Sequence, residues 1–237
     1  MNDLTNITEH PEPLQLGMLL YPNLTLLDLV GPQAVLGMHA RTHLVWKTLD
    51  VVMSDSGVGI QPTATLDTCP KDLDILFVPG GMGTAQAMED PTLLQFLWDR
   101  APRARYVTSV CSGSLLLAAA GLLRGYRSTS HWAALEFLRG YGAEPVKARV
   151  VVDRNRFSGG GVTAGIDFGL TLLAHLRGED TAKLTQLMLE YDPAPPFNAG
   201  TPDAAGPEMT ERVLQMLDET QQHLQRLSDE ARSATAA

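Results

Sequence analysis

The sequence predicts an α/β protein with a mainly parallel central sheet. Three apolar runs lack the polar alternation of a half-exposed strand and therefore indicate strands buried on both faces: residues 16–21, 74–78 and 106–110. Patterns typical of helices follow each run. Strands that alternate with helices favour a parallel sheet covered by helices. No linker divides this stretch, so one domain is expected over residues 15–205.

The elements are expected in the following order. The expected strands are residues 16–21, one or two strands within 44–53, then 74–78, 106–110 and 146–152. The expected helices are residues 31–38, helical segments from 82 to 98, a helix from 112 to about 121, then 132–138, 164–176 and 208–227. Turns are expected at residues 57–62 and 153–156. The first helix is expected to begin at Gly31 because Pro32 fits a first turn, where its missing N–H costs no hydrogen bond.

The two ends of the chain differ from this domain. Residues 1–14 are polar and contain two prolines, which predicts a mobile tail. Residues 193–207 are rich in Pro, Gly and Ala, as is typical of a loop or linker. Residues 206–237 are predicted to form an amphipathic helix with a frayed end. Its apolar stripe comprises Met209, Val213, Met216, Leu217, Leu224 and Leu227. The stripe must cover an apolar surface, either of its own domain or of a second subunit.

The composition excludes several classes of protein. A net charge of −9 argues against a nucleic-acid-binding surface. The longest apolar run, residues 115–123, is too short to span a bilayer. The acidic N-terminus also lacks the pattern of a signal peptide. Cys69 and Cys111 cannot form a disulfide framework, and Cys69 lies in a turn-like stretch where we interpret it as structural. A free thiol suits a reducing compartment, so a cytoplasmic location is expected.

Cys111 is the strongest candidate for a reactive side chain. It directly follows the expected strand 106–110, and Ser112, Gly113 and a helical pattern come next. The thiol is therefore expected at a turn beside a helix N-terminus, whose free N–H groups and positive dipole favour a thiolate. This is the layout of the nucleophile elbow of serine hydrolases, with sulfur in place of oxygen. A buried structural cysteine is the alternative, but the surrounding strand and helix favour a nucleophile.

Asp28, Gly81 and Cys111 each come just after a predicted strand. The carboxyl ends of parallel strands lie along one edge of the sheet, so these three residues are expected to meet in one ligand site. Asp28 interrupts the apolar run 26–30, which predicts a partly dry environment and a raised pKa. A carboxyl group of that kind serves as a general acid/base near neutral pH. The alternative is that Asp28 caps the following helix.

Gly81 and Ser112 are the candidates for stabilising an anionic intermediate. Their backbone N–H groups form the natural oxyanion pair, although Gly81 equally suits a tight turn and the Ser112 hydroxyl either binds substrate or caps the helix. His131 is either the base of a Cys–His pair or a histidine of the core or of a helix start. Glycines 159–161 match no phosphate-binding pattern and are interpreted as room for the backbone. No spacing of potential ligands predicts a metal site.

Five short motifs together resemble the ThiJ/PfpI superfamily. They are residues 27–32 (LDLVGP), 78–81 (VPGG), 110–113 (VCSG), 129–132 (TSHW) and 163–168 (TAGIDF). The resemblance extends from about residue 16 to residue 191. It implies a flavodoxin-like sandwich, a homodimer and a cysteine nucleophile at a strained elbow.

Residues 186–197 and 200–202 are similar to the C-terminal signature of the isonitrile hydratase group within this superfamily. This resemblance implies hydration of isonitriles, R–N≡C, to N-substituted formamides through a covalent thioimidate. Cys111 would be the nucleophile and Asp28 the acid/base, with a small isonitrile as substrate and no cofactor. The group carries threonine where this chain has Ser112. Serine keeps the hydroxyl but lacks the methyl, so a looser geometry is expected with the same reaction type.

Other functions remain open at this stage. Related transcriptional regulators share these motifs but carry a long DNA-binding part, whereas the stretch after Pro207 is short and acidic. A non-catalytic redox sensor would use Cys111 as an accessible thiol of low pKa. A glyoxalase-like or deglycase activity would need His131 to reach Cys111. The peptidase and amidotransferase branches usually place a histidine beside the cysteine, where Ser112 stands.

Overall fold

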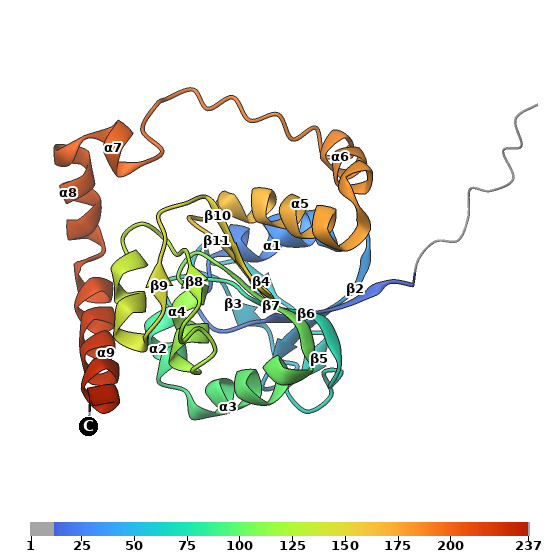
Figure 1. Ribbon diagram of the computed structural model, residues 1–237, viewed down its shortest axis with the longest axis horizontal. Coiled ribbons are helices and arrows are strands. Elements are labelled where there is room, and N and C mark those ends of the chain that lie inside the picture. The colour runs from blue at the N-terminus through green and yellow to red at the C-terminus, as the bar shows by residue number, and fades with distance from the viewer. Residues whose placement is uncertain (1–11, 237) are drawn as a thin grey trace, which may run out of the picture.

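The computed structural model describes residues 12–236 as a central sheet with helices on both faces (Figure 1). The strands of the sheet are β1 (Leu14–Leu19), β2 (Ala40–Trp46), β5 (Ala64–Thr65), β6 (Leu73–Val78), β7 (Ala104–Val110), β10 (Val150–Asp153) and β11 (Arg156–Gly159). Their order across the sheet is β10-β11-β7-β6-β1-β2-β5. All neighbouring strands run parallel except β10 and β11, which form an antiparallel pair at one edge. The fold is therefore the flavodoxin-like α/β sandwich predicted from the sequence.

Two small strand pairs lie outside this sheet. They are β3 (Val52–Met53) with β4 (Gly59–Ile60), which is antiparallel, and β8 (Arg127–Ser128) with β9 (Glu144–Pro145), which is parallel. The turn expected at residues 57–62 is thus partly a strand, because Ile60 pairs with Val52.

The helices form two layers. They are α1 (Leu26–Leu36), α2 (Thr84–Met88), α3 (Pro91–Arg100), α4 (Gly113–Ala119), α5 (Ala164–Arg177), α6 (Glu179–Met188), α7 (Pro202–Ala205), α8 (Pro207–Met216) and α9 (Asp218–Ala236), with 3₁₀ turns η2 (Ala101–Arg103) and η3 (Leu135–Tyr141). Helices α1 and α5 pack together on one face of the sheet, whereas α2, α3 and α4 lie on the other (Figure 1). The two layers exclude water from the central strands.

The middle strands supply the core. Leu16, Ile75 and Val107, on the neighbouring strands β1, β6 and β7, are each fully buried. Their side chains belong to continuous apolar strands, which only a sheet covered on both faces can bury. This core holds the carboxyl ends of β1, β6 and β7 side by side, and the functional candidates follow these ends.

Helix α1 corrects one expectation from the sequence. It begins at Leu26 rather than Gly31, and Pro32 lies inside it. The missing N–H of a proline costs one hydrogen bond in a helix interior. Here Leu29, Val35 and Leu36 bury the helix against the core, which offsets that cost. The earlier start places Asp28 in the first helical turn.

Three other elements differ from expectation in extent or type. The segment expected as a helix over residues 132–138 is the 3₁₀ turn η3, and the strand expected at 146–152 is shortened to β10. The helix expected at 208–227 is divided into α8 and α9 at Leu217, whose backbone is not helical. Asp218 and Glu219 then favour a new helix start, because acidic side chains stabilise a helix N-terminus.

The C-terminal helices follow an extended segment that leaves α6 and arches to α7 (Figure 1). Helix α9 packs against η3, where it buries Leu224 and Leu227. Helix α8 leaves Met209 and Met216 exposed. The C-terminal part of the predicted apolar stripe, Leu224 and Leu227, therefore covers its own domain. Within residues 12–236, no helix has both the length and the apolar character that crossing a membrane requires.

Candidate active site

Cys111 occupies the sharp turn between β7 and α4. Its φ angle is +56°, a left-handed conformation that costs a non-glycine residue about 1–3 kcal/mol. The surrounding backbone holds it there, since the Cys111 N–H donates to the carbonyls of Gly160 at 2.7 Å and Gly159 at 3.1 Å. The Cys111 carbonyl accepts hydrogen bonds from the hydroxyls of Ser130 and Ser114. The residue is a strained elbow fixed on both sides, as its sequence position predicts.

Two glycines let the elbow approach the end of β6. A Cβ atom on Gly113 would lie 2.6 Å from the carbonyl oxygen of Pro79. A Cβ on Gly80 would lie 2.6 Å from the Ser112 nitrogen and 2.8 Å from Asp28 Oδ2. Only glycine avoids these clashes, so this close approach of three loops depends on the glycines at both positions.

Asp28 lies fully buried beneath the elbow. Its Oδ2 accepts a 2.9 Å hydrogen bond from the Gly80 N–H, whereas Oδ1 has no hydrogen-bond partner among the described residues. Asp28 does not cap the helix, because Thr25 is the N-cap residue of α1. Burial raises the pKa of the Asp28 carboxyl to about 7, although the Gly80 N–H and the Cys111 thiol partly oppose this rise.

The Cys111 thiol lies beside the Asp28 carboxyl, and each side chain affects the pKa of the other. Burial raises the pKa of the Cys111 thiol well above its usual value, and the neighbouring Asp28 raises it further. The Ser112 backbone N–H lowers this pKa, as expected of a helix N-terminus, but burial outweighs it. The helix N-terminus therefore acts in the predicted direction, but burial has the larger effect on the pKa of this enclosed thiol. Asp28 is the carboxyl group beside this thiol.

Ser112 and Gly81 meet at this site, but in a different way from the one the sequence predicts. The Gly81 N–H donates to Ser112 Oγ at 3.1 Å, so it is engaged rather than free for an oxyanion. Ser112 Oγ also lies 2.8 Å from Thr84 Oγ1. The Ser112 hydroxyl therefore joins the elbow to the loop after β6. The Ser112 backbone N–H, which lowers the pKa of Cys111, is the remaining donor of the expected oxyanion pair.

Tyr21 and Thr84 support the site and were not singled out from the sequence. The fully buried Tyr21 hydroxyl donates to the Pro79 carbonyl at 2.7 Å and lies 3.1 Å from Thr84 Oγ1. Thr84 in turn reaches Ser112. Both residues follow the carboxyl end of a strand in the central sheet, which is the signal that locates Asp28 and Gly81.

His131 takes no direct part in the elbow. Within the described residues, no hydrogen bond or ion pair joins it to Cys111. Its Nδ1 accepts the Ala133 N–H at 3.3 Å, its ring lies 5.4 Å from that of Trp132, and burial lowers the pKa of its imidazole. His131 therefore lies in the turn that precedes η3, whose N-cap residue is Ala134. The neighbouring Ser130 contacts the elbow instead, through the Cys111 carbonyl.

Gly160 and Gly161, which follow β11, lie beside the elbow. A Cβ on Gly160 would lie 3.2 Å from the Ala148 carbonyl oxygen, and the Gly160 carbonyl accepts the Cys111 N–H. These glycines give the backbone room beside the elbow. Across residues 12–236, no cluster of three or more His, Cys, Asp or Glu side chains is arranged to hold a metal ion.

Comparison with known families decides the relationship of the chain. The model of the DJ-1/PfpI family matches residues 17–175, which include Asp28, Gly81 and the Cys111 elbow. The chain belongs to the DJ-1/PfpI family. This confirms the resemblance found in the motifs.

Individual relatives are consistent with this membership. The DJ-1/PfpI chain is 55% identical to isonitrile hydratase of Pseudomonas putida, over 81% of its own length and 85% of the relative. A crystal structure of a ThiJ/PfpI family protein from Pseudomonas syringae superposes with a TM-score of 0.92 at 48% identity, covering 96% of both chains. The transcriptional regulator GbdR of Pseudomonas aeruginosa is 31% identical, but the match covers only 52% of that regulator and 78% of this chain.

Proposed function

We propose that this DJ-1/PfpI protein hydrates isonitriles to N-substituted formamides. The observation that carries the proposal is the Cys111 thiol at a strained elbow beside a buried carboxyl, Asp28, whose pKa is raised to about 7. The 55% identity to an isonitrile hydratase supports the choice of substrate class. We further expect a cytoplasmic homodimer, as the resemblance and the cysteines imply.

In the proposed first step, the Asp28 carboxylate accepts the Cys111 proton as the sulfur attacks the terminal carbon of R–N≡C. The new S–C bond leaves an electron pair on that carbon, and protonated Asp28 returns the proton to it. The product of this step is a thioimidate, R–N=CH–S–Cys111. A carboxyl with a pKa of about 7 both accepts and returns a proton near neutral pH.

In the proposed second step, Asp28 deprotonates a water molecule as the oxygen of that water adds to the thioimidate carbon. Protonated Asp28 gives this proton to the adjacent nitrogen, and the tetrahedral carbon then carries a hydroxyl group, nitrogen and sulfur. As the C–S bond breaks, Asp28 takes the hydroxyl proton and passes it to the thiolate, and an N-substituted formamide leaves. The Ser112 backbone N–H, which interacts with the Cys111 sulfur, is placed to stabilise sulfur as it carries negative charge.

The other candidate functions find less support in this geometry. A redox sensor needs an accessible thiol of low pKa, whereas Cys111 is 6% exposed and burial raises its pKa. A glyoxalase-like reaction would need a base such as His131, which has no hydrogen bond to Cys111 among the described residues. Direct DNA binding remains disfavoured by the net charge of −9.

The test is to incubate the purified protein with p-nitrophenyl isocyanide and to measure formamide formation. The Cys111→Ala variant should lose turnover, whereas Cys69→Ala, at the other buried cysteine, should keep it. Methylglyoxal should not be consumed. Absence of formamide with the folded, reduced protein, or normal turnover by Cys111→Ala, would overturn the proposal.

A further inference from the structure

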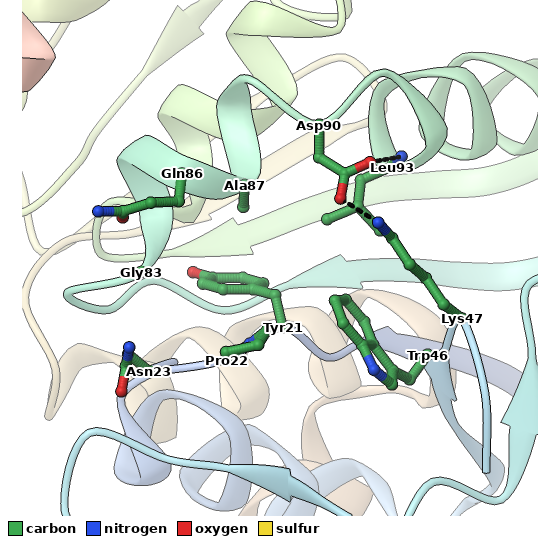
Figure 2. Close-up of a pocket in the computed structure, with 10 residues that line it drawn as sticks. All are labelled: Tyr21, Pro22, Asn23, Trp46, Lys47, Gly83, Gln86, Ala87, Asp90 and Leu93. Carbon is green, nitrogen blue, oxygen red and sulfur yellow. Dashed lines mark hydrogen bonds and ion pairs between the residues drawn. The ribbon is translucent and has the colours of Figure 1, made fainter. Parts of the chain in front are cut away.

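A cavity of about 380 Å³ opens beside Tyr21, and neither Cys111 nor Asp28 lines it (Figure 2). Its walls come from the ends of β1 and β2, from α2 and from the start of α3. The rings of Tyr21 and Trp46 and the side chains of Ala87 and Leu93 surround its interior (Figure 2). Carbon therefore dominates the surface that a ligand would meet. We refer to it as the Tyr21–Trp46 cavity.

The charges in the Tyr21–Trp46 cavity neutralise each other. Lys47 and Asp90 form an ion pair at one end, and Asp90 also caps α3 by accepting the N–H groups of Thr92 and Leu93 (Figure 2). Among the described residues, no other charged side chain lines the cavity. A charged ligand would find no unpaired counter-ion there and would lose its hydration, so the lining favours a neutral molecule.

The opposite end of the cavity is polar but uncharged. Asn23 and Gln86 stand there (Figure 2), and neither side chain has a hydrogen-bond partner among the described residues. A side-chain amide offers both a donor and an acceptor. A ligand group with an adjacent N–H and carbonyl, such as a secondary amide, complements both properties at once.

We propose that the Tyr21–Trp46 cavity binds a neutral small molecule that carries an aromatic or alicyclic ring and a secondary-amide end. The ring would lie against half-buried Trp46, and the amide would meet the exposed side chains of Asn23 and Gln86. A dry cavity of ~150 Å³ holds benzene, so this larger cavity has room for a six-membered ring and a short polar substituent. N-substituted formamides belong to this class, and their choice as the ligand rests on the proposed function.

Tyr21 connects this cavity to the elbow. Its ring forms a wall of the cavity, while its hydroxyl lies 3.1 Å from Thr84 Oγ1, which lies 2.8 Å from Ser112 Oγ. Substitution of Tyr21 would therefore disturb both sites. Ala87 and Gln86 line the cavity without contributing to the hydrogen bonds of the elbow, so they are the positions at which to test it.

The test uses Trp46 as its own reporter. In a Cys111→Ala background, which removes the nucleophile, Trp98→Phe and Trp132→Phe leave Trp46 as the single tryptophan. Titration with N-cyclohexylformamide should change its fluorescence saturably. Ala87→Leu should fill the cavity and raise Kd at least about tenfold, while the same substitution at exposed Ala204 should leave Kd unchanged. Cyclohexanecarboxylate should bind at least about tenfold more weakly than the formamide.

Gln86→Ala, at an exposed position, is a second variant that does not depend on repacking the cavity. Loss of one hydrogen bond should raise Kd for N-cyclohexylformamide by about three- to tenfold. The proposal would be overturned if N-cyclohexylformamide left the fluorescence of Trp46 unchanged, or if Kd were unchanged in both Ala87→Leu and Gln86→Ala. Because this assay involves no turnover, its failure is distinct from that of the hydratase proposal. If the unmodified protein hydrates isonitriles but the fluorescence of Trp46 does not respond to N-cyclohexylformamide, only the cavity proposal is wrong.

Discussion

The backbone N–H of Gly80 donates a 2.9 Å hydrogen bond to Oδ2 of Asp28 and thereby fixes the orientation of the buried carboxyl. The other oxygen, Oδ1, has no hydrogen-bond partner among the described residues and is the one that the proposed proton transfer would use. The Gly80 N–H favours the charged form, but burial outweighs it and holds the pKa near 7. The proposed chemistry depends on this balance.

Replacing Asp28 with asparagine should lower kcat for isonitrile hydration by at least about 10²-fold, because an amide cannot accept the Cys111 proton. Leu26→Ala, also in the first turn of α1, is a control that leaves the carboxyl in place. Steady-state kinetics on both variants, with circular dichroism to establish folding, provide the measurement. A fully active Asp28→Asn protein would exclude the acid/base role.

Stability should fall as pH rises, through Asp28. Its pKa is raised from 3.8 to about 7 in the folded protein, so the folded state holds a proton that the unfolded chain has released. This stabilisation is fully present below pH 3.8 and is lost as pH rises through about 7. Between pH 5 and pH 8, the free energy of unfolding in urea should decrease by ~2 kcal/mol more in the wild type than in Asp28→Asn. An identical pH dependence in the two proteins would contradict the buried-acid assignment.

Alanine at Gly80 should destabilise the protein and lower activity together. Its Cβ would meet the Ser112 nitrogen and Asp28 Oδ2, and displacing these groups should cost about 1–3 kcal/mol. Gly200→Ala is the matched control, since nothing lies within 4 Å of a Cβ there. Thermal unfolding and turnover of the two variants provide the measurement. Equal stability and equal turnover of Gly80→Ala and Gly200→Ala would refute the expectation.

Ser112→Ala should leave the Gly81 N–H without its acceptor and should cost about 1–3 kcal/mol of stability. Ser112→Thr keeps the hydroxyl and should retain both stability and turnover. Chemical denaturation of the two variants separates the effect of losing the hydroxyl on stability from the effect of adding a methyl group. Greater loss in Ser112→Thr than in Ser112→Ala would show that the space around Ser112, rather than its hydrogen bond, is limiting.

Leu224→Ala in α9 should lower the unfolding free energy by about 2–3 kcal/mol, because Leu224 is 2% exposed. Met216→Ala removes a side chain of α8 that is 75% exposed. This substitution should change the unfolding free energy by less than about 0.5 kcal/mol. Denaturant titration of both variants at the same protein concentration, high enough for a dimer to form, provides the comparison. If Met216→Ala costs as much as Leu224→Ala, α8 is covered in solution by a second subunit.

The sequence predicted the central strands and the elbow because these features are local. Continuous apolar runs specify β6 and β7, and the order strand, cysteine, small residue, glycine and helix specifies the turn at Cys111. The burial of Asp28 was also predictable, since it interrupts an apolar run. The carboxyl ends of parallel strands then bring these residues together whatever their separation in the sequence.

What escaped the sequence depends on contacts between distant segments. The start of α1 was misplaced because burial of its apolar side chains outweighs the local preference of Pro32. The engagement of the Gly81 N–H by Ser112 and the part of Tyr21 and Thr84 arise from three different loops. The rise in the pKa of the Cys111 thiol could not be predicted because the helix terminus is visible in the sequence, whereas the degree of enclosure is not.

The two hydrogen bonds from the Cys111 N–H to the carbonyls of Gly159 and Gly160 have a consequence for folding. They join positions that lie almost fifty residues apart in the chain, and pairing of such distant segments forms late. Until β11 has docked beside β7, the left-handed turn at Cys111 therefore lacks both hydrogen bonds from its N–H group. We therefore expect recovery of activity on refolding to report the completed sheet rather than collapse of its core.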